Sequence, residues 1–125
     1  MMAQSIVKTT EHQEQCAVIA WKWICIIKYP ELKNLFAIPN GGARDIVTGR
    51  KLKDEGVVAG VPDLFLAVPR GRYHGLFIEM KVKPNKPNAK QAEVMRSLES
   101  QEYAVKVCYG AGEAITVLEN YLKGN

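Results

Sequence analysis

The sequence has few cysteines and no long apolar run. Its 3 cysteines are far apart, form no C-x-x-C pair and lie in apolar surroundings, so we expect reduced core residues without disulfides or a zinc site. The longest apolar run, CAVIAWKWICII, is interrupted by Lys22 and is shorter than the ~20 residues that a bilayer requires. The opening residues, MMAQSIVKTTEHQEQ, lack a signal-peptide core, so we expect an intracellular protein with no transmembrane segment.

No repeat, low-complexity stretch or linker divides the chain. Its 125 residues, 47% hydrophobic and 24% charged, suit one compact domain spanning 1–125. The formal net charge of +4 favours an anionic partner such as nucleic acid, although it is too small to establish one.

Periodicity and turn residues predict a single α/β (α+β) domain with the order α-β-β-β-α-β-α. Thr10 and Asn88 are suited to cap helices that run to about Lys28 and Gln101. The remaining expectations are a weakly helical polar segment at 43–55, a last helix at 113–123, and strands at 35–38, 63–68, 76–82 and 103–109. Hairpins followed by a β-α-β crossover imply a mixed central sheet flanked by helices.

Two carboxylates and an amine lie on strands that are otherwise built for the interior. Side chains alternate along a strand, so Glu79 and Lys81 share one face of strand 76–82. If the hairpin folds symmetrically about Arg72, Lys81 pairs with Asp63 and Glu79 pairs with Phe65. Asp63, Glu79 and Lys81 then converge on one face, whereas a one-residue slip separates them.

This combination of groups suits phosphodiester hydrolysis. Adjacent carboxylates repel each other unless a positive charge lies between them, and Mg²⁺ prefers oxygen ligands. A lysine beside the metal can orient a water or neutralise charge in the transition state. The alternative is a solvated strand face on which Glu79 merely forms a salt bridge with Lys81.

The chain resembles a known nuclease family. G-V-P-D-L at 60–64 and I-E-M-K at 78–81 are similar to the signature of the PD-(D/E)xK superfamily, and the whole chain resembles its VRR-NUC domain family, in the small stand-alone form of phages and bacteria. Glu14, the segment N-G-G-x-R at 40–44, Gln91 and the order of elements also match. The resemblance implies a restriction-endonuclease-like core in a cytoplasmic protein of a bacterial or phage-infected cell.

The resemblance also implies roles for individual residues. Asp63, Glu79 and the Met80 backbone carbonyl are the expected ligands of Mg²⁺ or Mn²⁺, and Lys81 is the expected catalytic lysine. Glu14 is expected to reach the metal from the first helix, and Gln91 to project toward the water or the phosphate. From the residues alone, Glu14 is equally well a first-turn acid favoured by the helix dipole, and Gln91 a solvated helix residue.

Basic and turn residues around the motif are candidates for DNA contacts. The expected DNA-binding residues are Asn40, Gly41, Gly42, Arg44, Arg70, Arg72, Lys83, Lys86 and Lys90. Arg50, Lys51 and Lys53 add to the positive charge around the motif. The alternative is that all these residues lie in a solvated polar loop and have no binding role. No element looks suited to reading bases, so we expect recognition of backbone shape.

Together these inferences predict a metal-dependent, structure-selective DNA endonuclease. The resemblance further implies a Holliday-junction-resolvase-like homodimer that acts on branched DNA. The first helix is apolar almost all round, which is compatible with a partner subunit on its second side. The alternatives are a restriction-type or nicking nuclease on duplex DNA, a non-catalytic nucleic-acid-binding module with the same fold, and a structural subunit that binds no metal.

Overall fold

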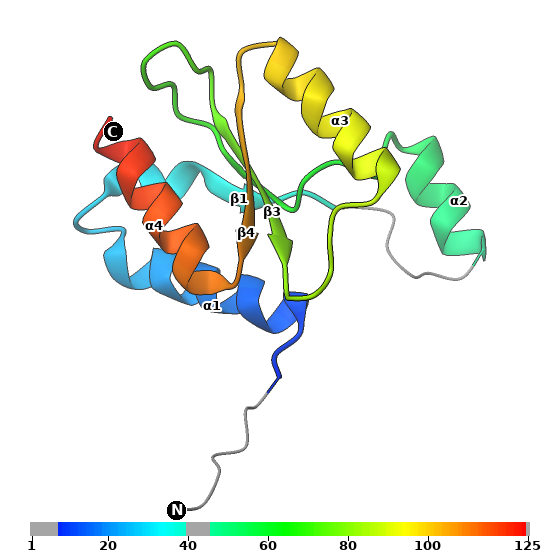
Figure 1. Ribbon diagram of the computed structural model, residues 1–125, viewed down its shortest axis with the longest axis horizontal. Coiled ribbons are helices and arrows are strands. Elements are labelled where there is room, and N and C mark those ends of the chain that lie inside the picture. Colours follow the sequence, from blue (N-terminus) through cyan, green and yellow to red (C-terminus); the bar gives the residue numbers. More distant parts are fainter. Residues whose placement is uncertain (1–7, 40–45, 125) are drawn as a thin grey trace, which may run out of the picture.

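Helices surround a four-stranded sheet in the computed structural model, which describes residues 8–39 and 46–124 (Figure 1). The elements of the described chain are α1 (Glu11–Cys25), the 3-10 helix η1 (Pro30–Asn34), β1 (Leu35–Ala37), α2 (Ile46–Asp54), β2 (Leu64–Leu66), β3 (Leu76–Lys81), α3 (Ala89–Ser100), β4 (Ala104–Tyr109) and α4 (Ala111–Leu122). The predicted mixed sheet flanked by helices is confirmed. The structure adds α2 between the first two strands, in the segment for which only weak helical character was expected.

Local capping signals place the starts of two helices correctly. The Thr10 hydroxyl accepts a hydrogen bond from the Gln13 N–H, and the Gln13 side chain accepts one from the Thr10 N–H. Asn88 and Gln91 form the same reciprocal pair at the start of α3. Such capping boxes satisfy backbone donors that the first helical turn leaves unpaired.

The sheet has the order β1-β2-β3-β4. The first three strands are antiparallel, and β4 is parallel to β3 after the crossover through α3. Helices α1 and α4 lie on one side of the sheet and α3 lies on the other (Figure 1). The core beneath α1 and α4 contains Val18, Leu64, Leu66, Leu76, Ile78, Met80 and Leu118.

An aromatic cluster occupies part of the opposite sheet face. Phe65 and Phe77 stack with ring centroids 4.3 Å apart, and Tyr103 meets both rings edge-on. This cluster fills the N-terminal half of β3, so the same face has room for polar groups only at the C-terminal end of the strand. The site therefore lies where β3 ends.

The expectation that all cysteines are core residues is wrong for one of them. Cys108 is buried and Cys25 is half-buried, but Cys16 is exposed on α1, and its sulfur lies 3.5 Å from His12 Nε2. The three thiols are free, as expected. The physical reason is that α1 buries only one of its sides in this chain, and Cys16 lies on another.

No helix within residues 8–39 and 46–124 is long and apolar enough to cross a membrane.

Candidate active site

The structure brings Asp63 and Glu79 to the same end of the sheet, with a register that differs from the expected one. Leu64 pairs with Ile78 and Phe65 with Phe77, so Asp63 is level with Glu79. The predicted pairing of Asp63 with Lys81 is wrong by two residues. The ladder centres the hairpin on Gly71 and not on Arg72, and a bridge between Arg70 and Tyr73 closes the turn. A shift of two residues preserves the face, so the acidic groups still converge.

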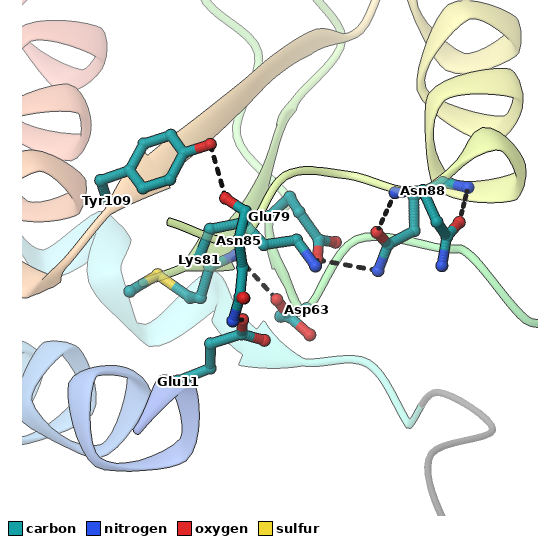
Figure 2. Close-up of polar contacts among 9 residues, drawn as sticks. Glu11, Asp63, Glu79, Lys81, Asn85, Asn88 and Tyr109 are labelled. Carbon is teal, nitrogen blue, oxygen red and sulfur yellow. Dashed lines mark hydrogen bonds and ion pairs between the residues drawn. The ribbon is translucent and has the colours of Figure 1, made fainter. Parts of the chain in front are cut away.

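Glu79 lies at the centre of the polar contacts. Lys81 Nζ lies 3.6 Å from Glu79 Oε2, and Gln91 Nε2 donates a hydrogen bond to the same oxygen over 3.2 Å (Figure 2). Glu79 is only 2% exposed and Lys81 only 8% exposed. The solvated-face interpretation is therefore wrong, because these charges lie inside the protein.

The Asp63 carboxylate accepts a main-chain hydrogen bond that a carbonyl of a neighbouring strand would otherwise accept. Its Oδ2 accepts a hydrogen bond of 2.7 Å from the Met80 N–H (Figure 2). The N–H and C=O of one strand residue point to the same side, so the Met80 carbonyl leaves β3 on the side of Asp63. Two carboxylates and one carbonyl thus face a common region at the end of the strand.

The electrostatics of the pair favour retention of a proton. Burial, followed by the charge of Asp63, raises the pKa of Glu79 to about 8, and Lys81 opposes this rise. Burial also raises the pKa of Asp63, although the hydrogen bond from the Met80 N–H works against it. Because the two groups are coupled, the pair as a unit holds a proton near neutral pH.

One oxygen of the Glu79 carboxylate lacks a hydrogen-bond partner among residues 8–39 and 46–124. Glu79 Oε1 is buried and accepts no hydrogen bond from the described chain. A buried carboxylate oxygen without a partner is unfavourable, and a cation would satisfy it. No three histidine, cysteine or acidic side chains of the described residues form a ready cage, so a metal here relies on two carboxylates and backbone. Hard oxygen donors of this kind fit Mg²⁺ or Mn²⁺.

Glu11, which the sequence analysis did not single out, faces the acidic pair from α1. Its charge raises the pKa of both Asp63 and Glu79. Its Oε2 accepts a hydrogen bond of 3.2 Å from Asn85, whose carbonyl in turn accepts one from the Tyr109 hydroxyl (Figure 2). No signal in the sequence distinguishes Glu11 from Glu14, because they lie one turn apart on the same helix.

The side chain of Glu14 reaches the start of α4. Its Oε1 accepts a hydrogen bond of 2.8 Å from the Ala111 N–H, which lowers the pKa of Glu14. The N-cap of α4 is Gly110, with φ of 95° and no side chain to cap the helix. A Cβ at Gly110 would lie 3.0 Å from Glu14 Oε1. Glu14 therefore acts as an N-cap supplied from another helix.

The predicted DNA-binding residues that the structure describes fall at opposite ends of the molecule. Arg70 lies in the hairpin turn, where it forms a salt bridge of 2.7 Å with Glu31 and donates a hydrogen bond to the Leu122 carbonyl. These contacts give Arg70 a structural role, because they tie the turn to two other segments. Arg72 lies in the same turn, with its guanidinium over the Tyr73 ring. Lys83, Lys86 and Lys90 are exposed near the start of α3, on the side of the acidic pair. Asn40, Gly41, Gly42 and Arg44 lie outside the described residues.

The comparisons with known proteins agree with this geometry. The model of the VRR-NUC domain family matches residues 2–112, so the chain belongs to that family of nuclease-type domains. A solved structure described as a VRR_NUC domain protein superposes with a TM-score of 0.78 at 28% identity, covering 96% of this chain and 93% of that one. No curated protein matches the chain. The family implies DNA as the partner and generally uses divalent metals.

Proposed function

We propose that this protein is a Mg²⁺- or Mn²⁺-dependent endodeoxyribonuclease that hydrolyses phosphodiester bonds. The observation that carries the proposal is the pair of half-buried Asp63 and buried Glu79. Glu79 Oε1 has no hydrogen-bond partner among the described residues, and Lys81 Nζ lies 3.6 Å from Glu79 Oε2. A salt bridge serving only the fold has no need of a second carboxylate that raises the pKa of the first. Burying such a pair costs stability, which is typical of functional sites.

The groups that would hold the cation are Asp63, Glu79 and the Met80 carbonyl. Glu11 would add negative charge from α1, in the role that the family resemblance suggested for Glu14. When bound, the cation supplies Lewis acidity and positive charge for phosphodiester hydrolysis. The pair must release its shared proton as the cation binds, because a ligating carboxylate is deprotonated.

The remaining side chains of the site hold Glu79 in position and supply positive charge. Gln91 anchors Glu79 Oε2 through its amide nitrogen, while its Oε1 is held by the Asn88 N–H, so its orientation is fixed at both ends. Lys81 presents an ammonium in a buried setting, where it stabilises negative charge on the phosphate more strongly than in water.

Cleavage of labelled DNA by three variants tests the proposal. Lys81→Ala should slow cleavage at least ~100-fold while binding Mn²⁺ within a few-fold of the natural protein, because lysine acts on charge in the transition state. Asp63→Asn should lose both Mn²⁺ binding and cleavage. Lys123→Ala, at an exposed position beyond α4, is the matched control for loss of a lysine. An inert natural protein, or a Lys81→Ala variant that cuts normally, contradicts the proposal.

We further propose that the protein is a homodimer acting on branched DNA, such as a four-way junction. Three large apolar side chains near the end of α1 support a partner: Trp23, Ile24 and Ile27 are 63%, 76% and 90% exposed. Clustered exposure of this kind marks an association surface. Two identical sites would suit the two symmetric strands of a junction.

Solution mass and substrate choice test these finer proposals separately. Ile24→Glu with Ile27→Glu should convert a dimer to a monomer in light scattering and leave the fold intact. Junctions, flaps and linear duplexes should then be compared as substrates for the natural protein. Equal cutting of linear duplex would favour a restriction-type or nicking enzyme, and a natural protein that is already monomeric contradicts the dimer.

A further inference from the structure

Helix α2 lies outside the sheet and its covering helices, beyond the first turn of α3 (Figure 1). Its exposed side chains include Arg50, Lys51 and Lys53, followed at its C-terminal end by Asp54 and Glu55. Arg50 and Lys53 are three residues apart, so they lie on adjoining parts of one side of the helix. No packing need of the core accounts for a basic helix in this position.

Helix α2 and the start of α3 line the same hollow. A hollow of about 610 Å³ lies between them, and both Lys53 of α2 and Lys90 of α3 line it. The segment after α2 packs closely on α3, because a Cβ at Gly60 would lie 3.1 Å from the Lys90 carbonyl oxygen. The two lysines are thus brought to one surface by segments that are distant in the sequence.

This surface adjoins the acidic site. Lys90 directly precedes Gln91, whose amide reaches Glu79. Lys90 is only loosely paired, with Nζ 4.0 Å from Glu93 and more than half of its side chain exposed. The surface that carries Lys90 and Lys53 therefore extends from the acidic site, which Gln91 contacts, to α2.

We propose that the first turn of α3 and helix α2 bind the phosphate backbone of duplex DNA on one side of the cleavage site. The inference rests on the proposed function and adds the direction in which the DNA leaves the site. Charge complementarity identifies the occupant: Lys53, Lys90 and Arg50 are exposed cations, and phosphate oxygens are the groups of DNA that such cations neutralise. Asp54 and Glu55 limit the contact to a few phosphates.

A second, separate hollow provides a matched control. It is lined by two exposed cations, Arg72 in the hairpin turn and Lys106 on β4, and by no residue of α2 or of the first turn of α3. Neutralising either pair removes the same net charge, so a difference between the pairs reports position and not total charge.

The experiment measures binding of a fluorescent 20-base-pair duplex in chelator, where no cleavage occurs, at several salt concentrations. Lys53→Gln with Lys90→Gln should weaken binding at least ~10-fold and reduce the slope of log K against log salt by roughly 1.8, as for two lost phosphate contacts. Arg72→Gln with Lys106→Gln should change the affinity less than ~3-fold. Circular dichroism should show that both double variants are folded.

The outcomes separate this inference from the nuclease proposal. Equal weakening by the two double variants, or an unchanged slope for Lys53→Gln with Lys90→Gln, overturns the assignment of α2. A natural protein that binds DNA through this surface but never cuts overturns the nuclease proposal alone. A protein that cuts normally while the α2 pair has no effect on Kd overturns this inference alone.

Discussion

Replacing Glu14 and Glu11 in turn should separate stability from metal binding, although the two residues lie one turn apart on α1. Glu14 Oε1 accepts the Ala111 N–H at 2.8 Å, at the start of a helix whose N-cap is glycine. Loss of an N-terminal acceptor costs ~1 kcal/mol, and loss of its negative charge at the helix N-terminus costs up to ~1 kcal/mol more. Glu14→Ala should therefore lower the free energy of unfolding by about 1–2 kcal/mol.

This free energy corresponds to a measurable shift in Tm. A chain of 125 residues has an unfolding entropy of roughly 0.26 kcal/mol/K, so Tm should fall by roughly 4–8 °C. Glu14→Gln should recover part of the lost Tm, because its amide oxygen can still accept the hydrogen bond from the Ala111 N–H. Both Glu14 variants should bind Mn²⁺ normally in calorimetry at 20 °C.

Glu11→Gln should behave in the opposite way. Its carboxylate raises the pKa of Asp63 and Glu79, so its removal relieves repulsion and should leave Tm within ~2 °C. The affinity for Mn²⁺ should fall about tenfold, since the site loses a negative charge. The reasoning is refuted if Glu14→Ala, fully folded at 20 °C, loses Mn²⁺ binding while Glu11→Gln binds it normally.

Two further predictions concern packing and pH. Gly75→Ala should destabilise the protein by roughly 1–3 kcal/mol in urea unfolding, because a Cβ there would lie 2.7 Å from the Phe65 ring, whereas Gly112→Ala, in open space on α4, should stabilise it by up to ~1 kcal/mol. The pKa of Glu79 is about 8 when folded and near 4.5 when unfolded, so the folded state binds the extra proton between these values. Metal-free stability should therefore decline as pH rises from 5 to 8, and Glu79→Gln should flatten this decline; an unchanged slope in the variant contradicts the assignment.

Features that depend on neighbouring residues in the chain were predictable from the sequence. Thr10 and Asn88 cap their helices because each meets a glutamine three residues later, a purely local interaction. Strand alternation correctly placed Glu79 and Lys81 on one face, and that conclusion survives a two-residue shift in register. The burial of Leu64 and Ile78 follows from the same alternation.

What the tertiary structure alone decided is which distant groups meet. The pairing of β2 with β3 sets the hairpin register, which puts Asp63 level with Glu79. The packing of α1 against α4 directs Glu14 to the Ala111 N–H and leaves Glu11 beside the acidic pair. These outcomes depend on contacts between segments up to 97 residues apart. The sequence by itself thus determined the chemical groups and their strand face, whereas long-range packing determined which acid joins them and on which side DNA is expected to lie.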